Sequence, residues 1–155
     1  MAKRKPPRLD PEKLVARIES YEQTYYISQD RDHDVPISDE AMIDIVARIE
    51  RISPRHKQHL GELLDITLAC AQSFSDDQPT MASDKPVLFM LNLGKRHRGF
   101  MAYLPSAAFW AIPRMIDTGR ITHIEVRFAR LHRGSGEMLS LYLMPASKIE
   151  EAGLV

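Results

Sequence analysis

The stretch KPVLFMLNLGKRHRGFMAYL, residues 85–104, decides the fold that the sequence predicts. Residues at every second position from Val87 to Leu93 are apolar and share one side of an extended chain, as in a β-strand, where successive side chains point to opposite faces. Residues 94–99 combine glycines with adjacent basic side chains and predict a turn. The alternation resumes over residues 100–104, so the stretch predicts a hairpin with a basic tip.

Downstream of this hairpin the sequence predicts a helix and two more strands. The helix begins at Pro105-Ser106, runs to Thr118 and is stopped by Gly119 at the C′ position, which favours glycine. The last elements follow in order: strands at residues 121–131 and 137–143, then a helical turn at residues 146–152. Residues 86–155 therefore predict a ββαββ unit with a four-stranded antiparallel sheet.

The predicted helix is long enough to cross back over one face of that sheet. The third strand then runs parallel to the second, and the order second, first, third, fourth makes every neighbouring pair antiparallel. In this order the two hairpin turns, at residues 94–99 and at Gly134-Ser135-Gly136, lie at opposite ends of the sheet.

Upstream of the hairpin, residues 10–75 predict a helical segment of three helices. Asp10-Pro11-Glu12 is typical of a helix start, with Asp as N-cap and Pro in the first turn. Two further starts are marked by Ser38-Asp39-Glu40 and Ser53-Pro54. Apolar residues follow each start at helical spacing, as in the series Leu14, Ile18, Tyr21 and Tyr25.

The expected fold class is α+β, with the N-terminal three-helix segment and the ββαββ unit packed as one domain. Residues 76–85 are rich in Ser, Asp and Pro and predict a linker, while residues 1–9 predict a disordered basic tail. The length of 155 residues and the 44% content of hydrophobic residues suit a single domain with its own core.

The cysteine count and the hydropathy pattern bear on the compartment. The single cysteine, Cys70, excludes an internal disulfide, and its apolar surroundings predict a buried thiol. No apolar stretch approaches the roughly 18–20 residues of a membrane span, and no export signal is evident. We therefore expect a cytoplasmic protein without a membrane partner.

Charge is distributed unevenly along the chain. Residues 1–80 hold 11 Lys and Arg against 15 Asp and Glu, a net charge of −4, whereas residues 85–148 hold 10 against 3, a net charge of +7. Such asymmetry indicates a partner rather than a fold. The basic half predicts contact with an anionic partner.

Two basic clusters carry that prediction. Lys95, Arg96, His97 and Arg98 form the first hairpin tip. The second cluster consists of Arg127 and Arg130, at the end of the third predicted strand, with His132 and Arg133 in the loop that follows. Cationic side chains beside glycines can hold phosphate through charge and backbone N–H groups, although a single such turn is more often a solvated loop.

The outer face of the predicted sheet offers a second feature. Alternation places Tyr103 and Tyr142 there with Met90, Met101, His123, Glu125 and Arg127. Aromatic and basic residues on an open sheet are typical of a platform for single-stranded nucleic acid. The alternative, which we favour, is that the three N-terminal helices cover this face.

No motif predicts a metal, a cofactor or a reaction. The acidic stretch Asp30–Asp34 imitates a calcium loop but has Val35 and Ala41 where Gly and Glu are needed. His56 and His59 lack an evident third ligand, so no metal site is expected. His123 and Glu125 fit a cross-strand polar pair better than a catalytic dyad, and the chain lacks the common catalytic motifs.

The sequence therefore predicts a non-enzymatic binding protein, a regulatory or accessory factor that binds DNA or RNA through its basic half. The alternative is a protein–protein interaction module, such as an adaptor, an inhibitor or an assembly subunit, which binds an acidic protein surface or forms a homo-oligomer or hetero-complex through its N-terminal helices.

Overall fold

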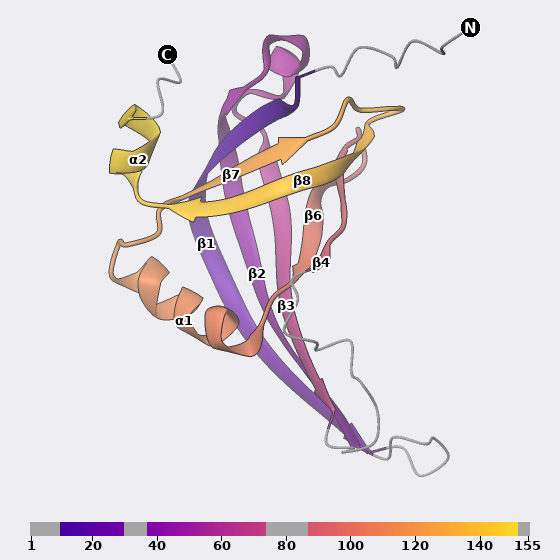
Figure 1. Cartoon of the computed structure of the whole chain (residues 1–155), viewed down its shortest axis with the longest axis vertical. Coiled ribbons are helices and arrows are strands. Elements are labelled where there is room, and N and C mark those ends of the chain that lie inside the picture. The colour runs from indigo at the N-terminus through magenta and orange to yellow at the C-terminus, as the bar shows by residue number, and fades with distance from the viewer. Residues whose placement is uncertain (1–9, 30–36, 74–86, 152–155) are drawn as a thin grey trace, which may run out of the picture.

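The computed structural model of the chain describes residues 10–29, 37–73 and 87–151 (Figure 1). The predicted tail of residues 1–9, the acidic stretch Asp30–Asp34 and the predicted linker of residues 76–85 lie outside the described residues. The elements are β1 (Glu12–Gln29), β2 (Ile37–Ile52), η1 (Pro54–His59), β3 (Leu63–Ser73), β4 (Val87–Leu88), β5 (Met90–Leu93), β6 (Arg98–Tyr103), α1 (Ser106–Asp117), β7 (His123–Phe128), β8 (Ser135–Met144) and α2 (Ala146–Glu151).

The strands form a closed seven-strand β-barrel, with β4 and β5 as successive pieces of one strand along β6. Around the barrel the order is β1, β2, β3, β6, β5, β8, β7 and again β1. The pairing of β3 with β6 is parallel, and the other pairings between described strands are antiparallel. The predicted α+β class is therefore wrong, since strands β1 to β3 replace the three helices.

Bulges explain why β1 imitates a helix. Leu14, Ala16 and Ile18 pack in the main core, whereas the buried Val15 packs in a separate cluster with Met144 and Ile149, so core contacts alternate here with a period of two. The register then shifts between Ile18 and Ser20, and the next core contact comes from Tyr21. An extra residue in one strand shifts the phase of the alternation. The step of four residues from Leu14 to Ile18 and the step of three from Ile18 to Tyr21 therefore match the spacing of one face of a helix.

Strand β2 has the sequence pattern of a helix because it carries apolar residues on both faces. Its buried residues alternate strictly: Ala41, Ile43, Ile45, Ala47 and Ile49. The partly exposed Met42 and Val46 face the other way, and together with Ile45 and Ile49 they also satisfy a helical period. Isoleucine-rich segments favour strands, because β-branched side chains are restricted in helices and pack well on a pleated surface.

The C-terminal elements occur where the sequence predicts them, but their pairing differs. Helix α1 is present with Gly119 at a φ of 73° after its end, and β7, β8 and α2 follow. However, β8 pairs with both β7 and β5. The four strands of the predicted ββαββ unit therefore lie in the order β6, β5, β8, β7, which is second, first, fourth, third along the chain. The predicted order is wrong because the sheet closes through the N-terminal strands, which supply the partners of β6 and β7.

Both ends of the barrel are covered. Helix α1 buries Phe109 and Ile112 in the core and reaches β1, where the Tyr21 hydroxyl donates to Asp117 Oδ1 at 2.6 Å. At the other end, the ring of His56 in η1 packs 5.9 Å from the ring of Phe128, and its Nε2 lies 2.5 Å from Glu12 Oε2. Pro54 therefore starts a short 3₁₀ helix here instead of the predicted long one.

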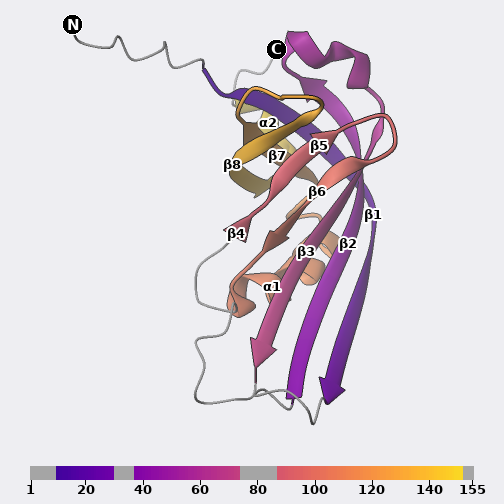
Figure 2. The ribbon, with the colours of Figure 1, turned by 90° about the vertical axis from the view of Figure 1, so that its right-hand side faces the viewer.

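Strands β1 to β3 continue past the barrel as a three-stranded sheet (Figure 2). The thiol of Cys70 lies in this region and is only 5% exposed, as the sequence predicts. Burial raises its pKa, which keeps the thiol protonated and unreactive.

We predict that Cys70 reacts slowly with a chromogenic disulfide reagent in the native protein and rapidly in denaturant. Absorbance of the released thiolate measures both rates. Equal rates in the two states would contradict the buried position of this side chain.

Candidate anion-binding site at the basic end of the barrel

The two basic hairpin tips lie side by side at one end of the barrel. The backbone N–H of Leu93 donates to the carbonyl of Gly134 at 2.7 Å, which ties the β5–β6 turn to the β7–β8 turn. A Cβ on Gly134 would lie 3.5 Å from the backbone of Gly94. The prediction of turns at opposite ends is therefore wrong, because β8 pairs with β5 and starts where β5 ends.

This arrangement brings together predicted anion-binding residues from both clusters. We call the two tips the basic end; its residues are Lys95, Arg96, His97, Arg98, Arg130, His132 and Arg133. Four of its lysines and arginines are exposed and form no ion pair with any described residue: Lys95, Arg96, Arg130 and Arg133. No described carboxylate competes with a ligand for these four side chains, and we call them the free cations.

Arg98 and Arg127 are already engaged. Arg98 Nε lies 3.2 Å from Glu62 Oε2, although the pair is not aligned as a hydrogen bond. Arg127 Nε lies 3.2 Å from Glu125 Oε1, and that carboxylate also lies 3.7 Å from Lys13 Nζ. Both predicted cations are therefore partly neutralised, and Arg127 lies on β7 rather than on a tip.

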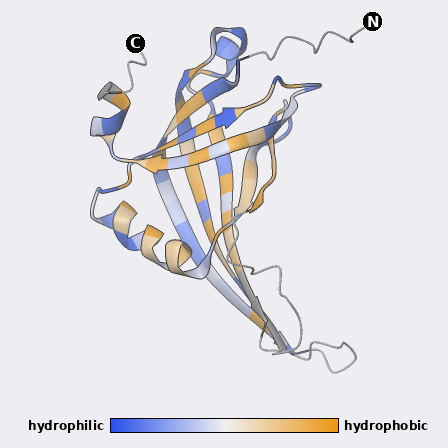
Figure 3. Cartoon of the chain, in the orientation of Figure 1, coloured by the Kyte–Doolittle hydropathy of each residue, from blue (hydrophilic) through white to orange (hydrophobic). Residues whose placement is uncertain are grey.

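Helix η1 adds basic residues that sequence reasoning missed. It lies at the same end of the barrel as the two tips, and its Lys57 is exposed (Figure 2). His59 of η1 and Arg98 of β6 both approach the carboxylate of Glu62, which links η1 to the first tip. Figure 3 shows hydrophilic residues at η1 and at both tips. In the sequence, the basic character of this segment is visible in the run Pro54-Arg55-His56-Lys57.

Arg133 has an unusual backbone for a long side chain. His132 and Ser135 exchange two backbone hydrogen bonds, of 2.8 and 3.1 Å, around a two-residue turn. Arg133 has a φ of 52° and Gly134 a φ of 81°, the pattern of a type I′ turn, which favours Asn or Gly at its first position. An arginine in the left-handed region costs roughly 1 kcal/mol.

The predicted aromatic platform is not assembled. Tyr103 lies on β6, and its hydroxyl donates to Glu40 of β2 at 2.9 Å, away from the tips. Burial and this carboxylate raise the pKa of Tyr103. Tyr142 lies on β8 opposite Glu125 of β7. The barrel thus separates the two tyrosines onto different parts of its outside, and neither belongs to the basic end.

His123 and Glu125 each have other partners. His123 Nδ1 lies 2.8 Å from the hydroxyl of Thr122, and its Nε2 lies 3.1 Å from Glu50 of β2. Glu125 is held by Lys13 and Arg127. The two residues therefore make separate polar contacts, and no described contact couples them as a dyad.

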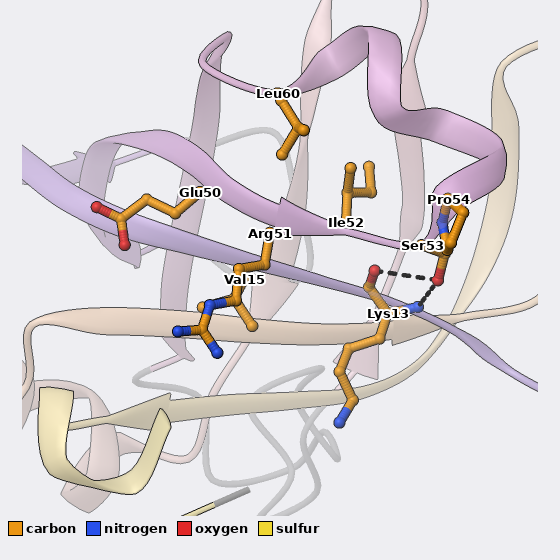
Figure 4. Close-up of a pocket in the computed structure, with 8 residues that line it drawn as sticks. All are labelled: Lys13, Val15, Glu50, Arg51, Ile52, Ser53, Pro54 and Leu60. Atoms are coloured by element: carbon orange, nitrogen blue, oxygen red, sulfur yellow. Dashed lines mark hydrogen bonds between the residues drawn. The ribbon is translucent and has the colours of Figure 1, made fainter. Parts of the chain in front are cut away.

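An open pocket of about 590 Å³ lies on the outside of β1 and β2 (Figure 4). Its lining residues are Lys13, Val15, Glu50, Arg51, Ile52, Ser53, Pro54 and Leu60. Lys13 is engaged by Glu125, and Glu50 accepts from Arg17 at 2.8 Å and contacts His123. The charged side chains of this pocket are largely paired within the protein. The pocket therefore has less unpaired positive charge with which to bind an anion than the basic end has.

Acidic residues gather toward the opposite end of the molecule. Residues 20–29, 37–47 and 66–73 of the long strands hold Glu22, Asp39, Glu40 and Asp44 but no Lys or Arg. Hydroxyls satisfy several of these carboxylates: Tyr25 donates to Asp39 at 2.8 Å and Thr67 to Asp44 at 2.7 Å. Hydrogen bonding to Asp39 raises the pKa of Tyr25. The charge asymmetry of the sequence therefore becomes a polarity along the barrel.

Among the described residues, no group of three His, Cys, Asp or Glu side chains could hold a metal ion. No described helix is long and apolar enough to cross a membrane. The chain matches no protein family, no curated protein and no solved structure, so its function is inferred from its own residues.

Proposed function

We propose that this protein binds nucleic acid without catalysing a reaction and that the basic end makes the contact. The observation that carries this proposal is the convergence of the free cations Lys95, Arg96, Arg130 and Arg133 on two adjacent turns. Clustered lysines and arginines bind phosphates by charge and by releasing counterions. The strain at Arg133 supports the same role, since glycine would suit that turn better.

The chemistry of the tips favours a polyanion over an acidic protein surface. Protein interfaces depend on a buried apolar centre with a few large anchor side chains. Within the described residues, the two tips carry no exposed large apolar side chain. A repeating phosphate backbone needs no such anchor, because its affinity comes mainly from charge.

Fluorescence anisotropy of labelled duplex DNA, single-stranded DNA and single-stranded RNA tests the proposal with the full chain. If each free cation contacts one phosphate of duplex DNA, the logarithm of the binding constant falls with the logarithm of salt concentration at a slope of about −4. Unchanged anisotropy at about 50 mM salt and micromolar protein for all three probes would overturn it. Binding to polyglutamate but to none of the nucleic acids would favour the acidic protein partner instead.

A cytoplasmic location is part of this proposal. It is supported by the single cysteine, which the fold keeps as a buried free thiol. Fractionation of cells that express the tagged chain is expected to place it in the soluble cytoplasmic fraction with nucleic acid.

Arg133→Gly is predicted to separate stability from binding. Glycine relieves the left-handed strain, so the free energy of unfolding rises by up to about 1 kcal/mol. The lost cation weakens binding to every nucleic acid probe and lowers the salt slope by about 1. Urea unfolding and anisotropy measure the two effects. Arg133→Asn, which tolerates this turn and also lacks the charge, is expected to behave in the same way.

A further inference from the structure

Strand β1 has an open edge over much of its length. β7 pairs with it as far as Arg17, and the N–H of Ile18 donates to the carbonyl of Thr122 at 2.9 Å. From Ser20 onward, the described residues pair with β1 on the β2 side alone. Figure 2 shows β1 as the outermost of the three long strands. Residues 20–27 therefore present backbone donors and acceptors along a strand edge that no described strand covers.

This edge lacks the features that protect sheet edges. Proteins block exposed edges with lysines, prolines, bulges or covering elements, because such edges otherwise pair with other chains. Residues 20–27, SYEQTYYI, contain no Lys, Arg or Pro and a single charge, Glu22. The bulge of β1 lies before this segment, between Ile18 and Ser20. Beyond it, Tyr25, Tyr26 and Ile27 are 55%, 58% and 55% exposed.

We propose that this edge pairs antiparallel with the same edge of a second copy of the chain, in a register centred on Tyr25. A two-fold axis then joins two three-stranded sheets into one continuous sheet. In this register Thr24 lies opposite Tyr26 of the other copy and Glu22 opposite Ser28. Glu22, the one charged residue of the edge, does not lie opposite Glu22 of the other copy. Pairing in this register therefore places no like charges directly opposite each other.

The acidic residues beside the edge give this association a distinct salt dependence. Glu22, Asp39 and Glu40 of both copies come near one another, and salt screens their repulsion. Dimerisation is therefore expected to strengthen with salt, whereas binding to nucleic acid weakens. The two opposite trends keep this inference separable from the proposed function.

The test is sedimentation equilibrium of the full chain with and without charges at the edge. The side chains of Thr24 and Tyr26 are exposed and make no hydrogen bond with another described residue, so substitutions there leave the barrel intact. The variant Thr24→Lys/Tyr26→Lys places lysines opposite each other, and we expect a dissociation constant at least about 100-fold higher than that of the wild type. The variant Thr24→Lys/Tyr26→Glu places opposite charges together and is expected to restore the dimer.

Tyr142→Lys is the matched control, because Tyr142 is an exposed tyrosine on β8 and should leave the dimer unchanged. Hydrogen exchange of the wild-type chain adds a measurement without mutation: residues 20–27 should gain protection as the concentration rises. A wild-type monomer at about 0.5 M salt, a dimer unaffected by the lysine pair, or a failure of the charge-swapped variant to restore it would each overturn the proposal.

Discussion

Gly99→Ala should lower the free energy of unfolding by about 3 kcal/mol or more, a larger loss than any other single substitution considered. Gly99 lies on β6 opposite Asp65 of β3, in the parallel pairing that closes the barrel. A Cβ at this position would lie 1.9 Å from the Asp65 carbonyl oxygen and 2.9 Å from its carbonyl carbon. These are backbone atoms and cannot rotate away, so one strand must move and the ladder between β3 and β6 must break.

Thermal unfolding followed by circular dichroism measures this effect, and the midpoint is expected to fall by about 10 °C. Gly94→Ala is the control on the same hairpin, because the nearest atom to its Cβ, the His97 carbonyl oxygen, lies at 3.5 Å, an ordinary contact. Its effect should stay within about 0.5 kcal/mol. Equal midpoints for the two variants would show that β3 and β6 do not approach each other as closely as described.

Reversing two charges at the basic end is expected to have the largest effect on binding. The variant Arg96→Glu/Arg130→Glu removes one free cation from each tip and adds two anions that repel phosphate. We expect the affinity for duplex DNA to fall at least about 100-fold at about 50 mM salt, and the salt slope to fall by about 2. Anisotropy titrations at several salt concentrations measure both quantities.

The matched control for this variant is Arg114→Glu/Arg120→Glu. Both arginines are exposed, in α1 and just after it, and lie away from the tips. The two double variants have the same net charge, so a general charge effect would weaken both equally. Equal losses of affinity would therefore contradict binding at the basic end, whereas a loss confined to Arg96→Glu/Arg130→Glu supports it.

Local chemistry made part of this molecule predictable. The β5–β6 hairpin follows from alternation around a glycine-containing turn, and α1 follows from its stop at Gly119. The basic residues of both tips were identified as candidates because charge is a property of composition. The burial of Cys70 followed from the apolar residues around it.

The N-terminal strands were not predictable by the same means. In β1 the bulge before Ser20 shifts the alternation, and in β2 both faces carry apolar residues, so each segment fits a helical period equally well. What selects strands is pairing with segments far along the chain. Val15 of β1 pairs with Arg51 of β2 and with Glu125 of β7, and each pairing supplies hydrogen bonds that no local pattern records.

The sequence by itself determined which residues carry charge, where the first hairpin turns and where α1 ends, because these depend on neighbours along the chain. Only the tertiary structure decided that Arg96 and Arg130 lie on adjacent turns, that Tyr103 and Tyr142 lie apart, and that β7 pairs with β1 only as far as Arg17. The physical reason is barrel closure. Pairing β6 with β3 and β8 with β5 gives each strand of the barrel a partner strand on both sides, and this closure fixes which turns meet at one end.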